Sequence, residues 1–123
     1  MIESPHKGKK GFTRLRNALF YSIDGLKAAV GNEDAFRQEL LLALVLIPTA
    51  FLLHRSGVGR ALMIGSVILV LIVELLNSAV EATVDRISIE NHHLAKRAKD
   101  LGSAAVLLSL VNLAAVWGLV LTV

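Results

Sequence analysis

The sequence predicts an all-α membrane protein, with one N-terminal amphipathic helix in the membrane interface and three transmembrane helices after it. The first observation is composition: of the 123 residues, 54% are hydrophobic and 5% aromatic, which is far more aliphatic than an ordinary soluble domain. The second is that long apolar stretches alternate with short polar connections. The third is charge. The formal net charge of +3 comes from cations beside those stretches, so anionic lipid headgroups are a simpler partner than nucleic acid.

Several kinds of chemistry are excluded or left without their usual motif. The absence of cysteine excludes disulfides, thiolate metal sites and cysteine nucleophiles. No small-x-small cleavage pattern follows the first long apolar run, so we expect no cleaved signal peptide. The sequence also lacks a GxxxxGK[ST] phosphate-binding loop and the glycine-rich loop of protein kinases. Composition alone therefore leaves phosphoryl transfer as one idea among several.

The N-terminal part is predicted to hold a polar tail and an amphipathic helix. Residues 1–10 form the basic polar tail. Within residues 11–31, apolar side chains recur at intervals of three and four beside a basic polar side: Phe12, Leu15, Leu19, Ile23, Leu26 and Val30. This pattern favours a helix in the membrane interface, with an ordinary bundle helix as the alternative. Gly31 is expected to end it and Asn32 to cap the next helix.

Residues 32–123 are predicted to form a three-helix transmembrane domain. The spans are expected at about 35–53, 60–86 and 99–122. The first is extended back from the apolar run at residues 40–53, because that run is shorter than the roughly 20 residues that cross a bilayer. Pro48 is expected to kink this helix. The second span is longer than a bilayer requires, so its end should project into water before a polar connection at residues 88–100.

An acidic face at the end of the second span organises the chain. Its members share one face at helical spacing: Glu74, Asn77, Ser78, Glu81 and Asp85. The opposite face is apolar: Leu75, Leu76, Val80 and Val84. Carboxylates inside a membrane are costly and usually functional. Glu81 is expected near the membrane boundary and Glu74 about two turns inside it, so the two depths imply two different tasks.

The distribution of positive charge predicts the topology. Eleven of the thirteen Lys and Arg residues lie on the side of the N-terminus and of the second connection, against Arg55 and Arg60 on the other side. The positive-inside rule then places the N-terminus and the acidic face on the cytoplasmic side of the membrane. The carboxylates would face the compartment that contains ATP.

Paired carboxylates reached from the cytoplasm suit a hard cation. Mg²⁺ commonly binds one or two carboxylates together with substrate phosphates, and Glu81 is better placed for this than Glu74. Glu74, which is deeper, is suited to act as a general base. Lys99 returns to the same boundary on the next helix and could contact phosphate oxygens. Two other interpretations stay open from the pattern alone: a proton or ion pathway, and a packing subunit of a larger complex.

Four motifs, in this order, resemble those of the bacterial integral-membrane diacylglycerol kinases over nearly the whole chain from Gly11. They are Gly11-Phe-Thr-Arg14, Asn32-Glu-Asp-Ala-Phe-Arg-Gln-Glu39, Glu74-Leu-Leu-Asn-Ser-Ala-Val-Glu81 with Val84-Asp-Arg86, and Ala98-Lys-Asp-Leu-Gly-Ser-Ala-Ala105. The resemblance implies a homotrimer of three-span subunits in the bacterial cytoplasmic (inner) membrane, with active sites shared between subunits. It implies transfer of the γ-phosphoryl group of MgATP to the hydroxyl of a membrane lipid.

The resemblance also implies roles for particular residues. Glu74 would be the general base, and Glu33 and Glu81 would bind Mg²⁺. The residues implied to contact ATP are Arg14, Tyr21, Glu33, Asn77, Glu81, Glu90, Asn91, His92, Lys99 and Asp100. Those implied along the lipid substrate are Ala35, Phe36, Arg37, Gln38, Glu39, Glu74 and Ser103.

Some positions depart from the family pattern or bear on the choice of lipid. Ile23 and Val30 stand where relatives often carry tryptophan, and Asn91 replaces a common tyrosine beside His92. A sister branch phosphorylates undecaprenol, and the shared acidic face does not separate the two substrates. Residues 37–39, Arg-Gln-Glu, resemble the diacylglycerol branch, whereas the undecaprenol branch tends to have an apolar residue and a histidine after the arginine. The resemblance therefore favours diacylglycerol, with undecaprenol as the alternative.

Overall fold

The computed structural model describes residues 10–87 and 92–123, and within them the chain forms four α-helices. They are α1 (Gly11–Asn32), α2 (Asp34–Leu52), α3 (Gly57–Ile87) and α4 (His93–Thr122). Helices α2, α3 and α4 are each long and apolar enough to cross a membrane. The all-α class and the number of candidate spans predicted from the sequence are thus confirmed.

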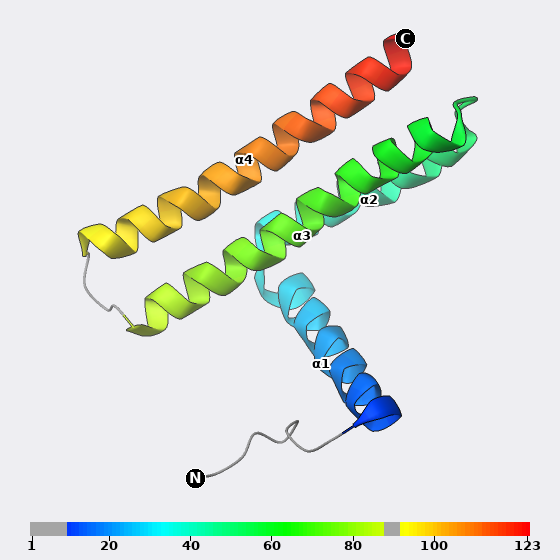
Figure 1. Cartoon of the computed structure of the whole chain (residues 1–123). Coiled ribbons are helices and arrows are strands. Elements are labelled where there is room, and N and C mark those ends of the chain that lie inside the picture. The colour runs from blue at the N-terminus through cyan, green and yellow to red at the C-terminus, as the bar shows by residue number, and fades with distance from the viewer. Residues whose placement is uncertain (1–9, 88–91) are drawn as a thin grey trace. The chain divides into compact units, whose positions relative to one another are not determined.

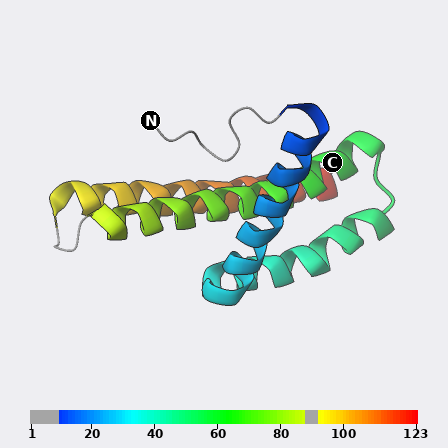
Figure 2. The ribbon, with the colours of Figure 1, turned by 90° about the horizontal axis from the view of Figure 1, so that it is seen from below.

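The chain divides into two compact units, one up to Glu33 and one from Asp34 onward. The first unit contains α1. In the second unit, α3 packs against both α2 and α4, and the two views show α3 and α4 side by side along their length (Figures 1 and 2). Within this unit α3 runs antiparallel to both α2 and α4 (Figures 1 and 2).

The packed core of the second unit lies among the three long helices. Its buried members are small or flexible side chains plus the single tryptophan: Ala43, Ala50, Met63, Val67 and Trp117. Trp117 Nε1 donates a hydrogen bond to the Met63 carbonyl oxygen at 3.1 Å, which ties α4 to α3 inside this core. Small alanines let the helix backbones approach closely, as membrane helix pairs require.

The turn between α2 and α3 satisfies the free backbone groups at both helix ends. The Arg60 guanidinium donates from Nε and Nη2 to the Leu53 carbonyl oxygen, at 3.2 and 2.7 Å. Ser56 Oγ accepts a hydrogen bond from the Gly59 amide at 3.0 Å, which is the geometry of a helix N-cap. These bonds fix the turn that sets α2 against α3.

Two local features differ from the expectations. Asn32 does not lie between two helices: it is the last residue of α1, and its Nδ2 donates to the Ala28 carbonyl oxygen at 2.9 Å. An interaction within α1 therefore takes the side chain that was expected to cap α2. The fourth helix begins at His93, well before the expected start of the third span, because His92 serves as its N-cap through an Nδ1 that accepts from the Leu94 amide at 3.1 Å.

Candidate active site

The predicted acidic face of α3 points toward the other helices. Glu74 is buried, with only 5% of its surface exposed, and Asn77 and Glu81 are half-buried. On the face predicted to be opposite, Leu76 is 62% exposed and Val80 is also exposed, whereas Leu75 and Val84 are half-buried. The polar side chains of α3 thus face the other helices, and its most exposed apolar side chains face away from them. This arrangement is expected of a helix whose outer side meets lipid or apolar partner helices.

Asn77 and Glu81 are joined by a hydrogen bond one turn apart. Asn77 Nδ2 donates to Glu81 Oε1 at 3.2 Å, while Asn77 Oδ1 is buried and has no hydrogen-bond partner among the described residues. That oxygen faces α4 at Gly102, where an added Cβ would overlap it. Buried polar atoms in proteins usually have a hydrogen-bond partner, so this unpaired oxygen marks Asn77 as a candidate site residue.

Glu39 of α2 lies near the same face. Its carboxylate is half-buried and repels that of Glu74, and its Oε2 is buried without a hydrogen-bond partner in the described part of the chain. Two carboxylates that repel each other in one partly buried place would both be stabilised by a cation bound near them. The two helices α2 and α3 therefore bring together Glu39 and Glu74, which lie 35 positions apart in the sequence.

At the polar ends of α3 and α4, the basic and acidic residues form ion pairs. Lys99 Nζ lies 2.6 Å from Asp85 Oδ1, across the two helices, and Lys99 is also attracted by the charge of Glu81. Within α4, Lys96 Nζ lies 2.7 Å from Asp100 Oδ2. The structure therefore places Lys99, expected to contact ATP, on the same side as Glu81.

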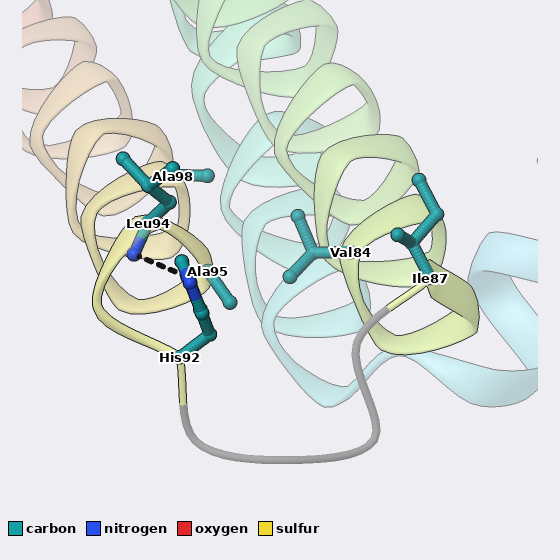
Figure 3. A pocket seen from close by; sticks show the side chains of 6 residues that line it. All are labelled: Val84, Ile87, His92, Leu94, Ala95 and Ala98. Atoms are coloured by element: carbon teal, nitrogen blue, oxygen red, sulfur yellow. Dashed lines mark hydrogen bonds between the residues drawn. The ribbon is translucent and has the colours of Figure 1, made fainter.

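A cavity of about 420 Å³ opens beside these ion pairs, between the end of α3 and the start of α4 (Figure 3). Its lining is mainly apolar, with one imidazole: Val84, Ile87, His92, Leu94, Ala95 and Ala98. The His92 ring is held there by its hydrogen bond with the Leu94 amide and stacks on His93, with ring centroids 4.5 Å apart. An apolar slot with one polar group is a common form of small-molecule site.

The remaining residues implied to meet the lipid occupy the first turns of α2 and one position of α4. Phe36 is buried, whereas Ala35 and Gln38 are exposed, and Arg37 forms an exposed ion pair with Asp34. Ser103 is also exposed. Of these five residues, only Phe36 has a buried side chain.

The other expected site residues lie elsewhere. Arg14 and Tyr21 are exposed on α1, and Glu33 is the C-cap of that helix, with its amide donating to the Ala29 carbonyl oxygen at 3.0 Å. These three residues belong to the first unit of the chain. Glu90 and Asn91 lie outside the described residues.

The donor set fits Mg²⁺ held jointly with a nucleotide. Among residues 10–87 and 92–123, no group of three or more His, Asp or Glu side chains is placed to hold a metal ion by itself. Mg²⁺ does not need such a cage, because it keeps several waters and binds through one or two carboxylates plus phosphate oxygens. Glu81, half-buried and hydrogen-bonded by Asn77, offers a carboxylate of this kind.

Sequence reasoning assigned no role to Gly102. It lay inside the quoted motif at residues 98–105, but a glycine has no functional group to draw notice. One signal could have pointed to it. A glycine in an apolar helix permits close approach of a neighbouring helix, and the neighbouring helix here carries buried polar groups.

These features define a class of protein. It is a helical membrane protein in which α3 carries carboxylates toward the other long helices, with Lys99 of α4 beside them. Comparison with known proteins identifies the class further. The family profile described as prokaryotic diacylglycerol kinase matches residues 20–121. The chain belongs to this family, which confirms the resemblance drawn from the four motifs.

Relatives that carry the name diacylglycerol kinase match over most of their length. The protein from Pseudomonas aeruginosa is 54% identical over 121 residues, covering 98% of this chain and 98% of that protein. The one from Haemophilus influenzae is 53% identical over 108 residues, covering 88% and 92%. The one from Escherichia coli K12 is 50% identical over 111 residues, covering 90% and 91%.

Proposed function

We propose that this protein is an ATP-dependent diacylglycerol kinase, which transfers the γ-phosphoryl group of MgATP to the lipid hydroxyl and forms phosphatidic acid. The names of its relatives support the substrate. The observation that carries the mechanism is the inward face of α3, with buried Glu74 one turn from the Asn77 to Glu81 hydrogen bond. Phosphoryl transfer asks mainly for positioning and charge neutralisation, and this face supplies both.

In the proposed reaction, Glu74 accepts the proton of the lipid hydroxyl as its oxygen attacks the γ-phosphorus. The bond from that phosphorus to the bridging oxygen of ADP then breaks, and ADP leaves. Burial of Glu74 keeps water away from the proton transfer. Asn77 would donate to an oxygen of the reacting phosphate, and Lys99 would offset the charge of the phosphates.

Glu81 and Glu33, the residue that follows α1, would hold the metal. Mg²⁺ held there would supply positive charge to offset that of the phosphates. Arg14, Tyr21, Glu90, Asn91, His92 and Asp100 would bind the nucleotide, with the adenine near the apolar cavity that His92 lines.

The proposed assembly is a homotrimer in the cytoplasmic membrane of a bacterium, with the N-terminus and active sites on the cytoplasmic side. The distribution of Lys and Arg supports this side of the membrane. The amphipathic α1 would lie in the interface and admit lipid from the side, toward Ala35, Phe36, Arg37, Gln38, Glu39 and Ser103.

The test is phosphorylation in mixed micelles with radiolabelled ATP, with diacylglycerol and undecaprenol offered separately and Mg²⁺ present or chelated. We expect phosphatidic acid only when Mg²⁺ is present. A preference for undecaprenol would keep the mechanism and change the substrate. No labelled lipid from folded protein would overturn the kinase proposal and return attention to an ion pathway, which transport assays in liposomes would detect.

A further inference from the structure

The contact between Gly102 of α4 and Asn77 of α3 has a consequence for the site. A Cβ built on Gly102 would overlap Asn77 Oδ1 and would lie only 3.2 Å from Asn77 Cγ. The amide group of Asn77 therefore fills the space that a side chain at residue 102 would need. Any other residue at this position must displace either the amide or the whole of α4.

The opposite end of the same amide group is engaged with Glu81. Because Nδ2 donates to Glu81 Oε1 at 3.2 Å, rotation of the amide away from residue 102 would break this bond. The amide is thus clamped between the backbone of α4 and the Glu81 carboxylate. The orientation of the Asn77 amide therefore depends on residue 102 being a glycine, which has no side chain.

We propose that Gly102 is a positioning residue for Glu81, acting through Asn77. The bare backbone at Gly102 lets α4 pack closely on Asn77, and the Asn77 amide then holds the Glu81 carboxylate in the orientation in which it would bind a metal. This inference rests on the proposed role of Glu81 as a metal ligand. Groups that orient a metal-binding carboxylate typically change metal affinity roughly 10–100-fold when they are removed.

The chain offers a matched control on the same helix. Gly118 also lies in α4, and a Cβ there would meet no atom within 4 Å. Alanine favours helix more than glycine does at both positions, so the two substitutions share this backbone effect, and only the one at residue 102 meets Asn77. A difference between Gly102→Ala and Gly118→Ala therefore reports that contact.

The first measurement is Mn²⁺ binding to the full-length protein with ATP, without lipid, followed by electron paramagnetic resonance. We expect Gly102→Ala to weaken Mn²⁺ binding roughly 10–100-fold and Gly118→Ala to leave it unchanged. The Mg²⁺ concentration for half-maximal lipid phosphorylation should shift in parallel. Equal Mn²⁺ affinities in the two variants would overturn the inference. Mn²⁺ binding is measured without turnover. A protein that binds Mn²⁺ but phosphorylates no lipid would therefore refute the kinase proposal and leave the inference about Gly102 standing.

A second measurement keeps the inference testable if Gly102→Ala disturbs packing. Thermal unfolding is compared for Gly102→Ala, Asn77→Ala and the double variant. Truncated Asn77 leaves room for a Cβ at residue 102, so we expect Gly102→Ala to lower the melting temperature in the native background and not in the Asn77→Ala background. The same loss in both backgrounds would show that the clamp does not exist.

Discussion

Lys99 Nζ lies 2.6 Å from Asp85 Oδ1, so an ion pair joins the start of α4 to the last turns of α3. Both side chains are partly exposed, and Glu81 adds a further attraction for Lys99 from the same face of α3. The pair therefore fixes where the Lys99 ammonium stands relative to the proposed metal ligand. Its value for stability is small, because exposed ion pairs are weakened by water and salt.

Asp85→Asn is expected to impair the use of ATP more than the fold. Without the Asp85 charge, the Lys99 side chain samples more positions, so the KM for ATP should rise by less than about fivefold, with kcat nearly unchanged. The melting temperature should hardly move. Thr83→Ala is the control, since among the described residues its hydroxyl donates to the Ala79 carbonyl oxygen within α3. A fall in kcat at unchanged KM would show that Asp85 does not act by positioning Lys99.

Glu74→Gln tests the general base. Glutamine keeps the shape of the side chain and removes its ability to take a proton, so lipid phosphorylation should fall roughly 10²–10⁴-fold. Thermal unfolding and the size of the detergent complex should match the unmodified protein. Normal turnover by the variant would remove Glu74 from the base role and leave its burial as a packing feature.

Glu81→Gln tests the metal ligand. The amide oxygen of glutamine is a weaker partner for Mg²⁺ than a carboxylate, so the Mg²⁺ concentration for half-maximal activity should rise by more than roughly tenfold. Saturating Mg²⁺ should recover part of the activity, which distinguishes this variant from Glu74→Gln. Metal titration curves that coincide with those of the unmodified protein would contradict the assignment.

Trp117→Ala tests the packing of α4 on α3. It removes a buried ring and the hydrogen bond from Nε1 to the Met63 carbonyl oxygen. The expected destabilisation is roughly 2 kcal/mol, less than for the same substitution in the core of a soluble protein. When these helices separate, the tryptophan side chain would meet apolar lipid and not water, so less free energy is lost. Leu119→Ala, at a side chain 64% exposed on the same helix, should cost much less. Equal melting temperatures for the two variants would show that Trp117 does not hold these helices together.

Helical periodicity was enough to predict the main features of α3. The polar side chains three, four and seven residues after Glu74 required a common face, and burial of Glu74 with exposure of Leu76 bears this out. Length and hydropathy likewise predicted three long helices. These properties are local, because each depends only on the residues of one helix.

Contacts between helices were beyond the reach of such reasoning. The overlap of Gly102 with Asn77 and the approach of Glu39 to Glu74 depend on the rotation of each helix about its axis, which packing sets. The start of α4 was missed for a local reason: His92 was considered for its chemistry and not as a helix cap. Roles for the residues of α1 depend on placement relative to the long helices and stay predictions.

Mixed trimers would test whether one site draws on two subunits. Glu74→Gln and Asp100→Asn proteins would be unfolded, combined in equal amounts and refolded, so that subunits assemble at random. If each site takes Glu74 from one subunit and Asp100 from its neighbour around a three-fold axis, about one quarter of the sites would contain neither substitution. Activity should then return to about that fraction of the unmodified level, although each variant alone is inactive. If each site were built within one subunit, every site would contain one substitution and the mixture would regain no activity. The control is to refold the two variants separately and then mix them.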